Sequence, residues 1–137
     1  MTSAVLDRLG PIKKVATSFE LADAITQGLP TSVLKVLVSQ GVLLASEIVL
    51  VISRRTLQDR RKKRLPLTPE ASDRAVRLAR LDAHATEVLG DPERARRWLR
   101  TPNPALEGRV PLELSVSSEG ARLVETVLGR IAHGVPF

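Results

Sequence analysis

The chain has 137 residues, a formal net charge of +6 at pH 7 and no cysteine. This length suffices for one ordinary domain or two very small ones that share a core, and the lack of cysteine excludes disulfides and thiolate chemistry. Hydrophobic residues make up 43% of the sequence, with one Trp and two Phe among them, so the core must be aliphatic. Abundant Leu, Ala, Arg and Glu favour helices over a β-sandwich, and we expect an all-α, cytoplasmic protein.

The first 18 residues predict a flexible N-terminal arm, because Gly10 and Pro11 interrupt them and their apolar residues show weak periodicity. They also lack the uninterrupted apolar run of a secretion signal. Ser18 is then expected to cap a helix over residues 19–27, which Gly28 ends.

The next segment, residues 30–40, predicts a helix because Pro30 and Gly41 frame it, although its β-branched residues would also suit a strand. A membrane span over residues 33–52 is another alternative, since 14 of these 20 residues are apolar. Lys35 and Glu47 interrupt that run, and an acid within a span costs ~2.5–3.5 kcal/mol. We therefore expect two buried helices broken near Gly41, and no membrane partner. The inward residues of the first would be Val33, Leu34, Leu37 and Val38.

Residues 44–63 predict a helix-turn-helix. The expected buried stripe of its first helix consists of Leu44, Ile48 and Val51. Ser53 is a good N-cap for the second helix, since its hydroxyl can accept from a free backbone amide of the first turn. Leu57 is the single apolar residue of that second helix, so it alone must anchor the helix to the core.

The second helix and its end also carry the charge of the protein. Residues 54–64 hold seven basic residues and one acid, which together account for the whole net charge of +6. A concentrated cationic segment on an otherwise neutral chain indicates a localised polyanion site, and the second helix of a helix-turn-helix is the one that enters DNA. The candidate base or phosphate contacts are Arg54, Arg55, Thr56 and Gln58, and the candidate backbone contacts are Arg60, Arg61, Lys62, Lys63 and Arg64. The alternatives are a solvated helix face or a basic surface for an acidic protein.

After a break at Pro66, Thr68 and Pro69 predict the start of another helix. This helix should run to about Leu81, and residues 83–89 either continue it or form a second helix. The expected inward residues are Ala75, Val76, Leu78, Ala79 and Leu81.

Residues 91–114 predict a rigid corner. Asp91 and Pro92 are a strong helix start, and two prolines around Asn103 stop that helix in a turn. Ala95, Trp98 and Leu99 should share one helix face, and Pro111 can open a short helix that carries Leu112 and Leu114. A last helix over residues 119–132, capped within 115–118, has an expected buried stripe of Leu123, Val124, Val127, Leu128 and Ile131.

Signals of catalysis are missing from the sequence. His84 and His133 are isolated, and neither a metal-binding His motif nor a glycine-rich phosphate loop is present. Acids such as Asp82 and Asp91 are expected to be caps or surface partners. We therefore expect no enzyme, no cofactor and no metal site.

The corner and the last helix resemble the toxin-binding domain of Xre–MbcA–ParS antitoxins, the bacterial partners of RES-domain toxins. The residues that carry this resemblance are Trp98–Leu106, Gly108, Pro111–Leu114, Gly120 and Gly129–Val135. Residues 52–57 resemble the start of the recognition helix in Xre-type proteins, although Val51 stands where such turns usually carry glycine. The resemblance implies an Xre-like helix-turn-helix domain over residues 19–65, packed against a small helical toxin-binding domain over residues 66–137.

The resemblance also implies a function. The protein would cover the active site of a RES-domain toxin that consumes NAD or transfers ADP-ribose, and would repress its own operon as a homodimer. The implied toxin contacts are Trp98, Arg100, Asn103, Leu106, Arg130, His133, Gly134, Val135, Pro136 and Phe137. Phe137 and its carboxylate are the expected plug of the toxin cleft, unless the tail is only a frayed end. Asn103 could instead serve only as a turn former, and Arg130 only as a partner of the helix dipole. The alternative function is a stand-alone helix-turn-helix regulator whose C-terminal half dimerises or binds a ligand.

Overall fold

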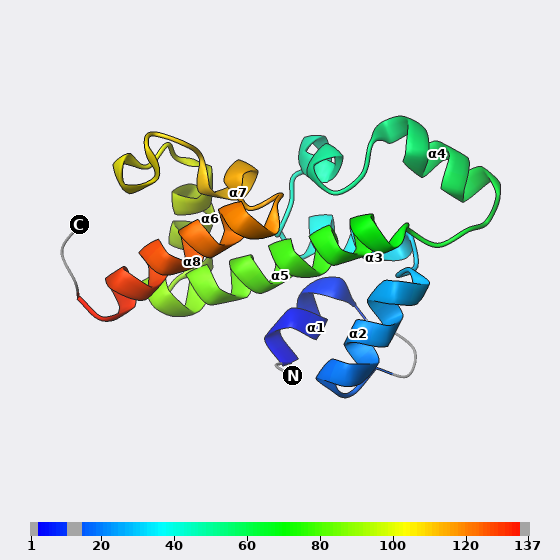
Figure 1. Ribbon diagram of the computed structural model, residues 1–137, viewed down its shortest axis with the longest axis horizontal. Coiled ribbons are helices and arrows are strands. Elements are labelled where there is room, and N and C mark those ends of the chain that lie inside the picture. The colour runs from blue at the N-terminus through cyan, green and yellow to red at the C-terminus, as the bar shows by residue number, and fades with distance from the viewer. Residues whose placement is uncertain (1–2, 11–14, 135–137) are drawn as a thin grey trace. The chain divides into compact units, whose positions relative to one another are not determined.

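The computed structural model describes residues 3–10 and 15–134, and within these ranges the chain is all-α, as predicted (Figure 1). The elements are α1 (Ser3–Leu9), α2 (Ser18–Gln27), α3 (Ser32–Ser39), the 3-10 helix η1 (Ala45–Leu50), α4 (Arg54–Lys62), α5 (Pro69–Leu89), α6 (Pro92–Arg100), the 3-10 turn η2 (Pro104–Leu106), α7 (Pro111–Leu114) and α8 (Ser118–Ala132). The aliphatic composition therefore predicted the fold class correctly.

The chain forms two compact units, Met1–Ala79 and Arg80–Phe137. The division falls inside α5, which continues as one helix to Leu89 and ends before Gly90, where φ is +78°. The first turns of α5 belong to the N-terminal unit, because the buried Ser72 hydroxyl accepts a hydrogen bond of 2.8 Å from the backbone amide of Leu29. The domain limits expected at residues 18 and 65 remain predictions.

The N-terminal unit begins with a helix, so the predicted irregular arm is wrong for residues 3–9. Val5 and Leu9 lie one helical turn apart and are both buried, which gives α1 an apolar face. This face packs toward α3, and a Cβ at Gly10 would come within 2.9 Å of a Val36 methyl group. The packing stabilises a helix that is too short to form alone in water.

The start of α2 lies one residue earlier than the sequence suggested. Thr17, and not Ser18, is the N-cap: its hydroxyl accepts from the Glu20 amide at 3.1 Å. The Glu20 carboxylate in turn accepts from the Thr17 amide at 3.0 Å, which completes a capping box. Ser18 is therefore the first helical residue. The reciprocal hydrogen bonds between Thr17 and Glu20 explain why Thr17, and not Ser18, is the N-cap.

The segment after α2 contains two short helices, and one of them differs from expectation. Val33, Leu34 and Leu37 of α3 are buried as predicted, and Val38 is half-buried. The segment from Ala45 is a 3-10 helix, and its predicted stripe is wrong at Leu44, which is 58% exposed. A 3-10 helix has three residues per turn, so the spacing of an α-helical stripe does not apply to it. Within the described residues, none of the helices is both long and apolar enough to cross a membrane.

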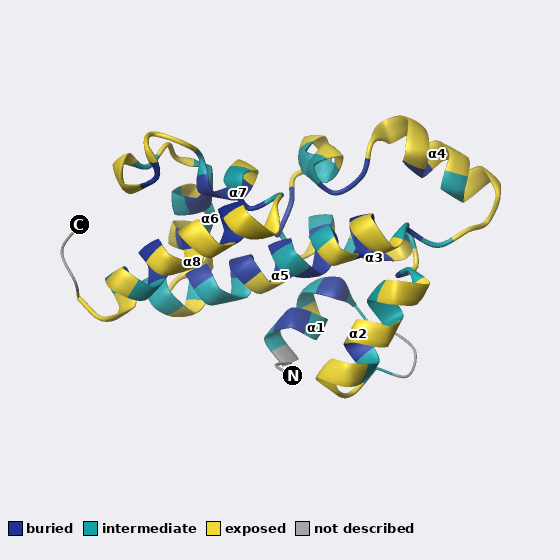
Figure 2. Ribbon diagram, viewed as in Figure 1, coloured by how far each residue is buried: buried dark blue, intermediate teal, exposed yellow. Residues whose placement is uncertain are grey.

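The predicted caps of the two following helices are confirmed. Ser53 accepts from the Thr56 amide at 3.2 Å at the start of α4, and Thr68 accepts from the Ala71 amide at 3.1 Å at the start of α5. Leu57 is the buried residue of α4, as expected from its being the only apolar one. Figure 2 shows α4 as an almost entirely exposed helix with this single buried position.

The C-terminal unit packs α6, α7, α8 and the later part of α5 around an aliphatic core. In α8 the residues Val124, Val127 and Leu128 are buried as predicted, whereas Leu123 is 53% exposed, which corrects the predicted stripe. One residue corresponds to about 100° around a helix, so Leu123 lies beside the buried stripe and not within it. Ala121 takes the inward position instead.

Gly120 lets α8 approach α7 closely. A Cβ at this position would overlap the backbone carbonyl oxygen of Leu114. We expect Gly120→Ala to lower the free energy of unfolding by about 2 kcal/mol, because the backbone cannot move aside as a flexible side chain can. The measurement is urea unfolding, with Gly129→Ala on the same helix as the control, since a Cβ there meets open space. The control should be neutral or slightly stabilising; equal losses in both variants would contradict the close approach.

Candidate functional site

The site residues predicted from the sequence lie on two surfaces, one in each unit. The first is the corner at residues 91–114. Asp91 caps α6 by accepting from the Arg94 amide at 2.9 Å, and Pro92 takes the first helical position, as predicted. Ala95 and Leu99 are buried and Trp98 is half-buried beside them, so the predicted apolar face of α6 is confirmed.

Asn103 organises the turn that follows α6. Its side-chain oxygen accepts from the Ala105 amide at 2.9 Å, and its backbone oxygen accepts from the amides of Leu106 and Gly108, both at 2.9 Å. Its own amide donates to the Arg109 oxygen at 3.1 Å, which closes the loop. Asn103 is thus a turn former, with four hydrogen bonds that fix the tip of the corner.

A buried ion pair joins α5 to α6 beneath this corner. The Asp82 side chain is only 2% exposed, and its two carboxylate oxygens lie 3.4 and 3.3 Å from Nε and an Nη of Arg96. The sequence led us to expect Asp82 as a cap or surface partner, which is wrong, because the residue faces α6 from inside the unit. A carboxylate buried this deeply must have a charged or hydrogen-bonding partner to offset its desolvation.

We expect Asp82→Ala to lower the free energy of unfolding by about 3 kcal/mol, because it leaves the Arg96 guanidinium, 30% exposed, beside a cavity. The measurement is chemical denaturation followed by circular dichroism. The matched control is Asp73→Ala, which removes an exposed carboxylate paired with Arg77 on the same helix. Its effect should stay below about 1 kcal/mol. Similar losses for the two variants would show that the buried pair does not stabilise the corner.

The implied toxin contacts differ in how accessible they are. Arg130, His133 and Gly134 are exposed at the end of α8. Trp98, Arg100 and Asn103 are half-buried, whereas Leu106 is buried and therefore supports the tip of the corner from within. Val135, Pro136 and Phe137 lie outside the described residues. The accessible part of the set thus consists of the α6 corner and the end of α8.

The second surface is the basic helix α4. The candidate DNA contacts Arg54, Arg55, Thr56, Gln58, Arg61, Lys62, Lys63 and Arg64 are all exposed. The turn before α4 is well formed without glycine, because Val51 has ordinary right-handed angles, φ −96° and ψ −49°. Arg74 of α5 donates to the Val51 oxygen at 2.9 Å and so holds this turn. The departure from the usual glycine therefore does not disturb the geometry.

Arg60 differs from the other basic residues of this segment. It is half-buried, and its Nε donates to the backbone oxygen of Pro66 at 2.7 Å. Lys63 is exposed but pairs with Asp59 at 3.3 Å. Arg60 therefore ties the end of α4 to the following loop, a structural role that the charge pattern did not indicate.

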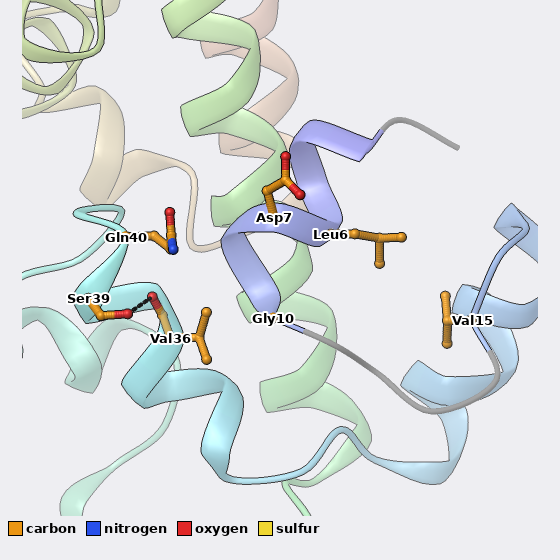
Figure 3. A pocket seen from close by; sticks show the side chains of 7 residues that line it. All are labelled: Leu6, Asp7, Gly10, Val15, Val36, Ser39 and Gln40. Atoms are coloured by element: carbon orange, nitrogen blue, oxygen red, sulfur yellow. Dashed lines mark hydrogen bonds between the residues drawn. The ribbon is translucent and has the colours of Figure 1, made fainter.

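A cavity of about 700 Å³ opens between α1 and α3 (Figure 3). Its lining consists of Leu6, Asp7, Gly10, Val15, Val36, Ser39 and Gln40. Asp7 is the one carboxylate in this lining, and the Ser39 hydroxyl donates to the Val36 oxygen at 3.0 Å. Across the described part of the chain, no three His, Cys, Asp or Glu residues are grouped to hold a metal ion.

Comparison with known proteins places both surfaces within matched regions. A family model described as antitoxin Xre-like helix-turn-helix domain matches residues 20–80, and one described as antitoxin Xre/MbcA/ParS C-terminal toxin-binding domain matches residues 84–134. The chain is 36% identical over 131 residues to Antitoxin Xre of Pseudomonas putida, which covers 96% of this chain and 82% of that protein.

Two other relatives extend this similarity. The chain is 29% identical over 138 residues to the Prs ADP-ribosylating antitoxin of a Sphingobium species, covering 94% of this chain and 80% of that protein. It is 36% identical over 85 residues to Antitoxin Xre of Yersinia enterocolitica, covering 61% of this chain and 57% of that protein. The basic helix α4 lies inside the first matched region, and the corner and α8 lie inside the second.

Proposed function

Because the chain belongs to the Xre/MbcA/ParS family of antitoxins, we propose that its C-terminal unit neutralises a RES-domain toxin in the cytoplasm by covering the active site of that toxin. The observation that carries this proposal is the match of the toxin-binding family to residues 84–134, the segment that holds the corner. The name of the Sphingobium relative favours ADP-ribosyl transfer as the chemistry of the toxin over simple NAD consumption.

The geometry of the corner suits an inhibitor. A protein that must block a cleft binds more tightly when its contact surface is ordered before binding, since less entropy is then lost. The Asp91 cap, the four hydrogen bonds of Asn103 and the Asp82–Arg96 pair supply that order. The exposed side chains of the corner, together with Arg130 and His133 at the end of α8, offer polar and cationic contacts to the toxin.

The test is co-expression of the chain with the protein encoded beside it. We expect the neighbour to be a RES-domain protein that stops growth when it is expressed alone, and growth to recover when both are produced. The two proteins should also purify as one complex. A neighbour that is toxic alone and equally toxic in the presence of this chain would refute the proposal.

A second function is supported by α4, namely repression of the operon of the protein itself. Eight of the nine candidate DNA contacts are exposed, and they lie on or directly after a helix that is capped and anchored as a recognition helix requires. One such helix has too small an interface for tight specific binding, so a homodimer on a two-fold operator is part of this proposal. Footprinting on DNA upstream of the reading frame tests it, and an unprotected upstream region contradicts it.

The competing function is a stand-alone regulator whose C-terminal unit only dimerises or binds a ligand. Both functions require α4, so DNA binding cannot separate them. The C-terminal unit can: deletion of residues 92–137 removes growth protection in an antitoxin but has no effect on any neighbour in a stand-alone regulator. The genetic neighbourhood gives the same answer, since a metabolic operon without a RES-domain protein favours the regulator.

A further inference from the structure

We infer that a groove at the end of α4 holds one phosphate group of the DNA backbone, gripped by Arg61 and Arg64 against the junction between α2 and α3. This inference rests on the DNA binding proposed above and gives two of the expected backbone contacts, Arg61 and Arg64, a defined site at the end of α4. The groove has a volume of about 520 Å³ and is lined by Gly28, Pro30, Thr31, Arg61, Arg64, Leu65 and Pro66. Among the described residues, this lining includes two guanidinium groups and no acid.

The groove is held by a rigid frame in which two distant parts of the chain cross. The Leu67 amide donates to the Leu29 oxygen at 2.8 Å, and the Leu29 amide donates to the buried Ser72 hydroxyl at 2.8 Å. Gly28 lies so close to this crossing that a Cβ there would overlap the Leu67 carbonyl oxygen. The Arg60 guanidinium fixes the other side through its bond to the Pro66 oxygen at 2.7 Å. The groove is therefore part of the fold and not a chance gap between loops.

The end of α4 presents the two arginines of the groove differently from their neighbours. Arg64 has a left-handed backbone, φ +56°, and the Leu65 amide bonds back to the Arg60 oxygen at 2.8 Å, which stops the helix. Arg61 and Arg64 are exposed, and among the described residues neither has a side-chain hydrogen bond or an ion pair. They therefore remain available to an anion, whereas Arg60 and Lys63 already have protein partners.

The chemistry of this lining selects a phosphate. Guanidinium groups present parallel N–H donors that match phosphate oxygens, and Thr31 in the same lining has a hydroxyl that can serve as one more donor. Pro30, Leu65 and Pro66 give the groove apolar walls, which strengthen its attraction for anions relative to open solvent.

The position of the groove suits a phosphate of DNA and not only a free one. The nine residues of α4 rise roughly 13 Å, and the major groove of DNA is about 12 Å wide. When Arg54 and Arg55 at the start of α4 face base edges, Arg61 and Arg64 therefore come to the backbone at the rim of the same groove. That contact fixes the register of the helix on the duplex.

The first experiment uses the full chain and inorganic phosphate without DNA. We expect phosphate, but not chloride at equal ionic strength, to shift the backbone amide signals of Gly28 and Thr31 in a saturable manner. The shifts should vanish in R61Q/R64Q and persist in K35Q/R122Q, which removes the same charge from exposed positions outside α4 and the groove lining. Absence of saturable shifts, or their persistence in R61Q/R64Q, overturns the inference.

The second experiment tests whether the phosphate belongs to DNA. In a duplex taken from upstream of the reading frame, each backbone phosphate is replaced in turn by an uncharged methylphosphonate. For the wild type we expect an affinity loss of roughly tenfold at one phosphate in each half-site. R61Q/R64Q should be weakened overall but should lose nothing further at that phosphate, whereas K35Q/R122Q should keep the sensitivity.

The outcomes separate this inference from the function on which it rests. If the wild type binds DNA and R61Q/R64Q stays as sensitive as the wild type at every phosphate, the groove holds no DNA phosphate and only the inference is wrong. If the wild type binds no DNA while phosphate still shifts the Gly28 and Thr31 signals, the proposed repression is wrong. The assignment of the groove to DNA is then wrong as well, and the groove is a site for a free phosphate group.

Discussion

Reversal of one charge at the end of α8, Arg130→Glu, should abolish neutralisation of the toxin while the protein stays folded. Arg130 is exposed in the last turn of α8 and lies in the stretch that resembles the toxin-binding family. A hot-spot arginine of an interface contributes about 2–4 kcal/mol, and in that role Arg130 predicts that its reversal raises the Kd for the toxin by roughly 30-fold to 1000-fold. Calorimetric titration of the purified toxin measures this change.

The control is Arg122→Glu, which reverses an exposed charge on the same helix outside the Gly129–Val135 motif and removes a surface pair with Glu119. It should leave the Kd within about threefold of the wild-type value. The alternative role of Arg130, as a partner of the helix dipole alone, predicts a different pattern. In that case Arg130→Glu costs at most about 1 kcal/mol of folding stability and leaves the Kd unchanged.

Removal of two cations at the start of α4, Arg54→Ala with Arg55→Ala, should lower the affinity for upstream DNA about 100-fold. Both residues are exposed in the first turn, where a recognition helix reaches base edges, and each contact of this kind contributes about 1–3 kcal/mol. The loss should shrink as salt rises, since part of it is electrostatic. Fluorescence anisotropy at several salt concentrations measures both effects.

A charge-matched control for this pair is Lys35→Ala with Arg122→Ala, which removes two exposed cations from α3 and α8. If DNA binding depends on α4, the control loses only the small share due to net charge. Equal losses in the two double variants would mean that any cation contributes alike and that α4 does not read DNA.

The features that sequence reasoning predicted well depend on local chemistry. Ser53, Thr68 and Asp91 cap helices because a short side-chain acceptor meets the free amides two or three residues ahead. Asn103 forms its turn between two prolines for the same kind of reason. Leu57 had to be buried because α4 offers no other apolar residue to the core. Each of these features depends only on residues that lie a few positions apart in the sequence.

The errors arose where structure depends on distant contacts. The burial of Val5 and Leu9 requires α3 as a partner, which the weak local periodicity of the first residues did not indicate. Leu44 and its neighbours carry an apolar pattern, but the pattern does not distinguish a 3-10 helix from an α-helix. Asp82 looked like any surface acid, because its partner Arg96 is brought to it only by the packing of α6 on α5.

The candidate sites show the same difference between features that local sequence determines and features that depend on distant contacts. Composition was sufficient to find the basic helix, because the whole net charge lies within residues 54–64. It could not separate Arg60, which holds the loop after α4, from Arg61 and Arg64, which line the groove. That distinction depends on where residues 28–31 cross the chain near Pro66, a contact with no sequence signal of its own.

The proposed inhibition is tested by titrating this protein against the enzymatic activity of the RES-domain toxin expected to be encoded beside it. NAD consumption or ADP-ribose transfer is followed while the antitoxin is added in increasing amounts. Covering of the active site predicts that activity falls to background at a fixed stoichiometric ratio and that Arg130→Glu fails to lower it at the same ratio. Full toxin activity in the presence of excess wild-type protein would show that the C-terminal unit does not cover the active site.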